Sequence, residues 1–202
     1  IRPSRIIRAI QMAPMKSTHP AVPPLLVAFL SLGFACGSLY AQTTTGAQAG
    51  ASGLVPIPIQ LPKPMFEGTP QNLAVPNLLK PLGRPRDPFL APAGVTNVAK
   101  GKKVTSSDME PVIGDLEQVT DGDKKGADGN FVELGPAKQH VTIDLGAPHE
   151  VFAILFWHFH KTPRVYFDVV VQLADDADFK TNVRTIFNND HDNTSSLGAG
   201  QD

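Results

Sequence analysis

Apolar and polar residues alternate in the second half of the chain, which predicts short β-strands. Residues 139–146 (QHVTIDLG) and residues 164–176 (RVYFDVVVQLADD) place apolar side chains at every second position, as expected of a strand with one buried face. Residues 151–159 (VFAILFWHF) are apolar on both faces, which predicts a central strand covered on both sides. Shorter strand candidates are residues 95–98, 102–106, 117–120 and 183–187.

Glycines separate these strand candidates, and no stretch has a convincing helical period. Many short strands with glycine-rich turns predict an all-β fold, either a β-sandwich or a jelly roll. We place this domain at residues 94–202, because the composition changes at Gly94.

Proline is concentrated before this domain and excludes long helices and central strands there. Residues 54–93 alternate proline with apolar residues and predict an extended, Pro-rich strap. A PxxP-type ligand for an aromatic groove is the alternative interpretation. We expect the strap to pack on the domain that follows it, through Ile57, Ile59, Leu61, Met65, Phe66, Phe89 and Leu90.

The N-terminal region has the features of a secretory signal peptide. A basic start at Met15 and Lys16 is followed by an apolar stretch, and we expect cleavage between Ala41 and Gln42. A membrane anchor is the alternative, although prolines and glycines interrupt the apolar run. We therefore read residues 1–41 as upstream residues plus signal peptide, assign no function to residues 1–14, and expect no membrane insertion after cleavage.

Two further features concern the exported chain. Cys36, the only cysteine, lies in a context similar to a lipoprotein cleavage site, although Gly33 and Leu32 depart from that pattern. Cleavage at Ala41 would instead leave a secreted or periplasmic chain without a thiol, and hence without disulfides or cysteine catalysis. Residues 42–53 (QTTTGAQAGASG) predict a flexible linker.

Charge argues against nucleic acid as a partner. The chain has 18 Lys plus Arg and 19 Asp plus Glu, but the charged side chains among its first 41 residues are all Lys or Arg. The remainder is therefore mildly acidic, whereas nucleic-acid-binding proteins usually present a basic face.

Four segments together resemble a discoidin domain, the type C domain of coagulation factors. They are TNVAKGKKVTSSD, the turn at Gln118–Asp123, HVTIDLGAPHEVFAILFWHF, and VVVQLADDADF. The resemblance covers about Gly94 to Asp202 and implies a galactose-binding-like jelly-roll β-sandwich. Such domains close with further strands that include an Arg-Tyr-rich segment. We therefore expect an incomplete sheet here, with an exposed edge.

The loop at residues 121–130 (DGDKKGADGN) gathers oxygen ligands and glycines, which suit a hard cation. It is not an EF-hand, and an Asx-turn loop with solvated carboxylates is an equal alternative. The discoidin resemblance implies a structural Ca²⁺ held by Asp121 and Asp123, with a closing Glu from a strand after Asp202.

The segment FWHFHK predicts a ligand-binding site at His158, His160 and Arg164. If this segment is a strand, both histidines share a face, and Trp157 and Phe159 point the other way. Relatives that bind glycans use His and Arg at one end of the barrel. A zinc site with His191, or imidazoles with a purely structural role, are the alternatives.

No pattern indicates catalysis. Asp175, Asp176 and Asp178 predict a turn at the end of a strand, and Asp190 and Asp192 predict a polar turn or, less favoured, a second cation loop. Nucleophile-elbow, zinc-protease and nucleotide-binding motifs are absent. We therefore expect a secreted, non-catalytic carbohydrate-binding domain. The alternatives are a structural or protein-adhesion module, or an accessory domain of an enzyme whose catalytic part lies outside this sequence.

Overall fold

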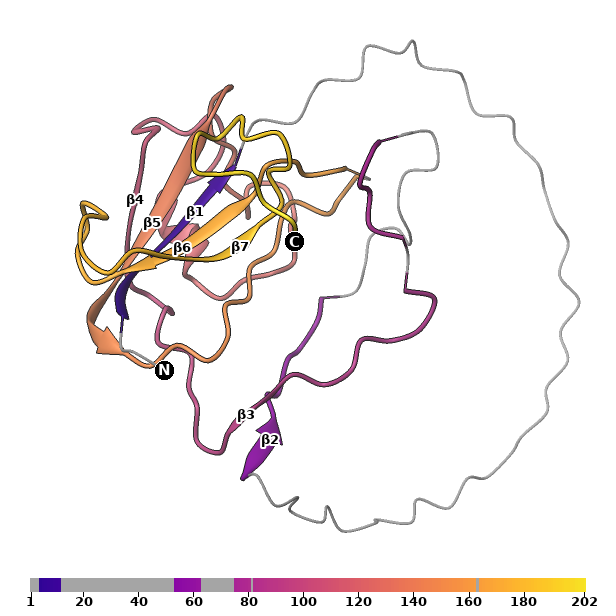
Figure 1. The fold of residues 1–202 in the computed structure, drawn as a ribbon, viewed down its shortest axis with the longest axis vertical. Helices are drawn as coiled ribbons and strands as arrows, with labels where there is room; N and C mark the ends of the chain where they lie inside the picture. Colours follow the sequence, from indigo (N-terminus) through magenta and orange to yellow (C-terminus); the bar gives the residue numbers. More distant parts are fainter. Residues whose placement is uncertain (1–3, 12–52, 63–74, 81, 163) are drawn as a thin grey trace, which may run out of the picture.

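The computed structural model describes residues 4–11, 53–62, 75–80, 82–162 and 164–202 (Figure 1). The predicted signal peptide, Cys36, almost all of the linker, and Met65 and Phe66 of the strap lie outside these residues. Within the described ranges, no helix is long and apolar enough to cross a membrane.

The main element is a five-stranded antiparallel sheet with the strand order β4-β5-β1-β6-β7. Its strands are, in chain order, β1 Ser4–Gln11, β4 Lys103–Ser106, β5 Gln139–His149, β6 Val170–Ala174 and β7 Arg184–Asn188. The described part of the chain contains one short 3-10 turn, η1 at Leu116–Val119, and no α-helix. The prediction of an all-β fold is therefore confirmed.

Several strand predictions are confirmed because their signal is local. β5 coincides with the alternating segment at residues 139–146, and β4 and β7 coincide with the candidates at 102–106 and 183–187. The candidate at 117–120 is wrong, because these residues form most of η1. Asp115 caps this turn, and Gln118 bonds back to the Asp115 amide, which favours a helical start over a strand. The candidate at 95–98 forms no strand either.

The core of the sheet is centred on β6. Every residue of β6 is buried. The core cluster comprises Leu145 from β5, Val169, Val171 and Leu173 in or beside β6, and Ile7 from β1.

The segment expected to be the central strand has a different conformation. Residues 151–162 contain no strand, because β1 occupies the sheet position between β5 and β6 (Figure 1). Val151 and Ile154 pack against the core from outside the sheet. The predicted strand at residues 164–176 is also shorter than expected and begins only at Val170.

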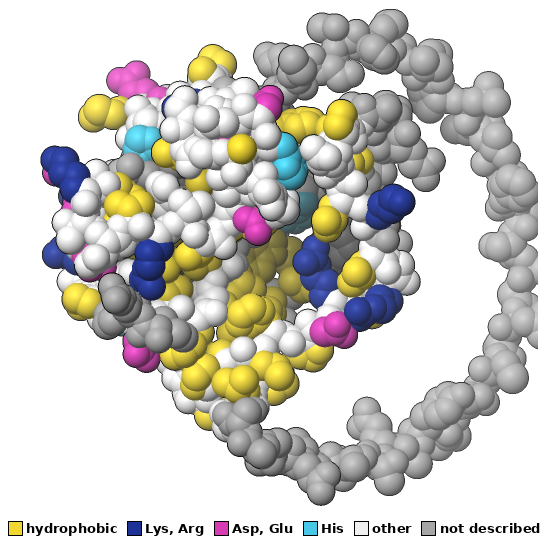
Figure 2. Space-filling model, in the orientation of Figure 1, with side chains coloured by type: hydrophobic (Ala, Val, Ile, Leu, Met, Phe, Trp, Pro, Cys, Tyr) yellow, Lys and Arg dark blue, Asp and Glu magenta, His cyan; other side chains and the backbone are white. Residues whose placement is uncertain are grey.

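The Pro-rich strap forms a ribbon of its own. β2 (Leu54–Pro56) pairs with β3 (Leu90–Pro92), and the ribbon lies apart from the main sheet (Figure 1). The expected packing is absent at Leu61, which is 76% exposed, and Phe89 and Leu90 are also about half exposed. Hydrophobic side chains are accordingly visible at the surface in this region (Figure 2).

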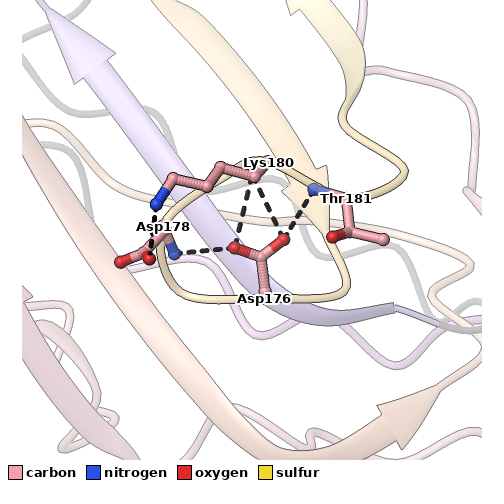
Figure 3. A network of polar contacts seen from close by, with 4 residues as sticks. All are labelled: Asp176, Asp178, Lys180 and Thr181. Carbon is pink, nitrogen blue, oxygen red and sulfur yellow. Dashed lines mark hydrogen bonds and ion pairs between the residues drawn. The ribbon is translucent and has the colours of Figure 1, made fainter.

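The turn after β6 is organised by one carboxylate, as Figure 3 shows. Asp176 accepts hydrogen bonds from the backbone amides of Asp178, Lys180 and Thr181, and Lys180 forms an ion pair with Asp178. Burial raises the pKa of Asp176, but these amide hydrogen bonds outweigh it and leave the pKa below its ordinary value. The predicted strand-terminating turn is confirmed.

Candidate ligand-binding site

Two segments singled out by the sequence, the loop at residues 121–130 and the segment FWHFHK at residues 156–161, lie against each other. The aromatic rings of Phe131 and Phe159 are tilted against each other with centroids 4.6 Å apart. Lys161 forms an ion pair with Asp128, and the ammonium of Lys124 lies 5.2 Å from the centroid of the Trp157 ring. These contacts hold the loop beside the segment.

A hollow of about 50 Å³ lies between the two segments and is mainly apolar. Enclosed pockets for drug-sized molecules are about 300–1,000 Å³, so this hollow has room for one edge of a small ligand. Trp157 lines the hollow and is 37% exposed, so part of its aromatic surface is open to a ligand. The lining residues are Lys124, Gly126, Asn130, Phe131, Trp157, His158, Phe159 and His160.

His160, which lines this hollow, has a buried polar atom without a partner among the described residues. Its Nδ1 lies 3.2 Å from the carbonyl oxygen of His158, so Nδ1 carries the proton and donates to that carbonyl. Nε2 is the second ring nitrogen and accepts a hydrogen bond when it carries no proton. This atom is buried and has no hydrogen-bond partner among the described residues. A buried polar atom without a partner is costly, and a ligand hydroxyl that donates to Nε2 would remove that cost.

Gly126 permits the close approach of the loop to His160. Its φ is +59°, a conformation that L side chains rarely adopt, and a Cβ placed there would lie 3.1 Å from His160 Cε1. A larger residue would therefore press on the His160 imidazole, which lines the hollow.

His158 has a different environment from His160. Its ring stacks on the ring of Tyr166, with centroids 3.9 Å apart and planes 10° from parallel. The Tyr166 hydroxyl donates a 2.8 Å hydrogen bond to the Phe159 carbonyl oxygen. Burial lowers the pKa of His158 to about 4, so its ring is neutral at physiological pH. Burial also raises the pKa of Tyr166.

Arg164, the third predicted site residue, does not line the hollow. Its guanidinium lies 4.7 Å from the centroid of the Phe159 ring, and its Nε donates to the Thr162 hydroxyl at 3.4 Å. Arg164 therefore supports the hollow through Phe159, one of its walls.

The side chains of residues 157–160 do not alternate between two faces, in contrast to the sequence prediction. Trp157 and Phe159 were expected to point away from His158 and His160, but all four line the same hollow. Alternation of faces holds only in an extended strand, and residues 157–160 form none. The sequence analysis also missed the contribution of Lys124, Gly126 and Phe131.

The carboxylates predicted to hold calcium make turn contacts. Asp121 accepts a 2.7 Å hydrogen bond from the Asp123 amide, and Asp123 accepts from the Lys125 amide and the Asn130 side-chain amide at 2.9 Å each. These are the contacts of successive Asx turns. Both residues are exposed, and each keeps oxygen lone pairs that a cation could use, so the donor set remains compatible with calcium.

A second carboxylate group combines Asp168, just before β6, with Asp190 and Asp192, just after β7. Asp168, Asp190 and Asp192 each place one oxygen within 4.8 Å of the others. The buried Asp190 side chain accepts hydrogen bonds from the amides of Thr194 and Ser195, at 3.0 and 2.8 Å. Burial raises the pKa of Asp168, and the neighbouring negative charges raise it further, despite a hydrogen bond from Thr194. The sequence analysis considered Asp190 and Asp192 but not Asp168, which is distant in the sequence.

Comparison of the chain with protein families, with curated proteins and with solved structures found no match.

Proposed function

We propose that this chain is a secreted, non-catalytic recognition domain that binds carbohydrate at the hollow lined by Trp157 and His160. The observation that carries the proposal is His160, which lines an aromatic-walled hollow and whose buried Nε2 has no partner among the described residues. Specific small-ligand sites combine apolar walls with a few directed polar atoms, and this hollow has that composition.

A sugar can use both the apolar wall and the polar atom of this hollow. Its C–H face is apolar and can cover the exposed Trp157 ring, where contact removes apolar surface from water. Its hydroxyl groups are donors as well as acceptors, so one of them can donate to His160 Nε2. The size of the hollow, about 50 Å³, suits one hydroxyl-bearing edge of a sugar ring with the rest lying over the mouth.

We also propose that the fold is the galactose-binding-like jelly roll of discoidin domains. The support is the discoidin-like order of segments, together with an antiparallel sheet in which strands distant in sequence are neighbours. A structural Ca²⁺ at Asp121 and Asp123 belongs to this proposal, as does export by a signal peptide cut at Ala41.

A structural or protein-adhesion module is the competing function. The observation that favours it is the stacking of His158 on Tyr166, which shows that one of the two histidines is used in packing. An accessory role beside a catalytic domain outside this sequence remains compatible with either function.

A glycan array with the full chain tests the proposal. We expect binding to at least one class among galactose-, fucose- and uronate-containing glycans, and loss of that binding in His160→Ala without a change in melting temperature. His191→Ala is the matched control, because His191 is an exposed histidine that does not line the hollow. Silence across all three glycan classes would overturn the carbohydrate proposal, and lost folding in His160→Ala would support the structural alternative.

A further inference from the structure

Lys124 is the only Lys, Arg, Asp or Glu side chain in the lining of the hollow. It comes from the loop at residues 121–130 and is half-buried. Its ammonium lies 5.2 Å from the centroid of the Trp157 ring, which lines the same hollow. A ligand that covers this ring therefore meets a positive charge.

The charge of Lys124 has no carboxylate partner within the described part of the chain. None of the ion pairs formed there involves Lys124. In the same loop, the Asp128 carboxylate is paired with Lys161, and the Asp123 carboxylate accepts two hydrogen bonds from amides of the loop. The Lys124 ammonium therefore remains available to an anion from outside the chain.

This ammonium should affect neutral and acidic sugars differently. A neutral sugar on the Trp157 ring takes water away from the ammonium and offers it only hydroxyl groups in return. A uronate has the same kind of ring and hydroxyl groups but also a carboxylate, which accepts a charge-assisted hydrogen bond. The lysine stem is flexible and its ammonium has three donors, so it can turn from the ring of Trp157 to that carboxylate.

We infer that the hollow selects acidic sugars, with Lys124 binding the carboxylate of a uronate whose apolar face covers Trp157 and whose hydroxyl groups reach His160. The inference rests on the proposed function and adds the class of sugar. Trp157 and His160 contact features that neutral and acidic sugars share. Lys124 is therefore the residue that determines specificity, and its loss should remove the preference for the acid without removing carbohydrate binding.

The test compares acidic sugars with their neutral esters by isothermal titration calorimetry of the full chain. The ligands are the methyl glycosides of galacturonic and glucuronic acid, and the methyl esters of the same compounds, which keep the ring and lose the charge. We expect at least one acid to bind about three- to tenfold more tightly than its ester at low salt. Equal affinities would overturn the inference and leave carbohydrate binding intact. Absence of binding to all four ligands would overturn it as well, and the neutral glycans of the array then show whether carbohydrate binding survives.

Two neighbouring lysines of the loop separate a local contact from the general charge of the loop. Lys124→Gln should abolish the preference for the acid, and Lys124→Arg, which keeps the charge, should retain most of it. Lys125→Gln is the matched control, because Lys125 is exposed and does not line the hollow. His160→Ala should instead weaken the binding of acid and ester alike. An equal loss of preference in Lys124→Gln and Lys125→Gln would overturn the inference.

Salt and a simple carboxylate provide a second readout. Raising the ionic strength from about 0.01 M to about 0.15 M shortens the screening length from about 30 Å to about 8 Å. The preference for the acid should therefore shrink, while the affinity for the ester stays unchanged. Sodium acetate, compared with sodium chloride at the same concentration, should not compete, because acetate has no ring to cover Trp157. Competition by acetate as strong as that by the uronate would contradict recognition of an acidic sugar.

Discussion

The ring of His158 lies nearly parallel to the ring of Tyr166, with centroids 3.9 Å apart, and this stacking places a titratable group in the wall of the candidate site. Burial lowers the pKa of His158 to about 4, against an ordinary value of 6.5. The folded protein therefore binds fewer protons than the unfolded chain between these two pH values.

The first prediction follows from that difference. The contribution of His158 to the free energy of unfolding should be fully present above pH 6.5 and should be lost as the pH falls toward 4. The slope should be at most about 1.4 kcal/mol per pH unit. His158→Phe keeps an aromatic ring on Tyr166 but removes the titration, so its stability should vary less over this range. Urea denaturation at a series of pH values measures both slopes, and parallel curves for the two proteins would contradict the buried neutral imidazole.

The second prediction concerns the core. Leu145 is 0% exposed and contacts the core cluster, so Leu145→Ala should lower the free energy of unfolding by about 2–5 kcal/mol through lost burial and the cavity left behind. Met109→Ala is the control, because Met109 is 88% exposed and a surface change should stay within about 0.5 kcal/mol. Equal effects of the two substitutions on the free energy of unfolding, measured in denaturant melts, would show that Leu145 of β5 is not part of the core.

The third prediction separates backbone strain from pressure on the site. Gly126 and Gly129 both have positive φ, but a Cβ on Gly129 meets nothing within 4 Å, whereas one on Gly126 meets the His160 ring. Gly126→Ala and Gly129→Ala should each lower stability, by about 1–3 kcal/mol for the strained backbone. Only Gly126→Ala should also weaken glycan binding, measured on the glycan found by the array. Equal loss of binding in both variants would show that pressure on His160 is not what weakens binding.

The fourth prediction concerns calcium. An ion that binds only the folded state stabilises it by about 2.7 kcal/mol at a hundredfold excess over Kd. If the proposed site at Asp121 and Asp123 binds calcium, calcium should raise the melting temperature of this chain, and the rise should disappear in Asp121→Ala. Asp168→Asn is the matched control at the other carboxylate group. A shift that survives Asp121→Ala but is lost in Asp168→Asn would place the ion at the wrong loop.

The elements predicted correctly are those whose signal is contained in a few neighbouring residues. β5 follows from alternation within residues 139–146, and the turn after β6 follows from the spacing of Asp176 and Asp178. β1 could not be predicted in the same way. Nothing within residues 4–11 indicates that they pair with residues more than a hundred positions away.

The candidate site shows the same limit. His158 and His160 could be singled out from composition, but the faces assigned to them assumed a strand at residues 151–159. That segment lies outside the sheet, so Trp157 and Phe159 share the hollow with the histidines. The partner loop with Gly126 and Phe131 is brought there by tertiary contacts, among them the ion pair of Lys161 with Asp128.

The most direct test of carbohydrate recognition uses Trp157, which is the only tryptophan in the chain and lies in the hollow. Its emission therefore reports on this site alone. We predict that titration with the methyl glycoside of the sugar found by the array changes the emission saturably. The change should be abolished in His160→Ala and preserved in His191→Ala. Emission that does not respond to a glycan bound by the chain would show that the ligand lies elsewhere and would contradict the proposed site.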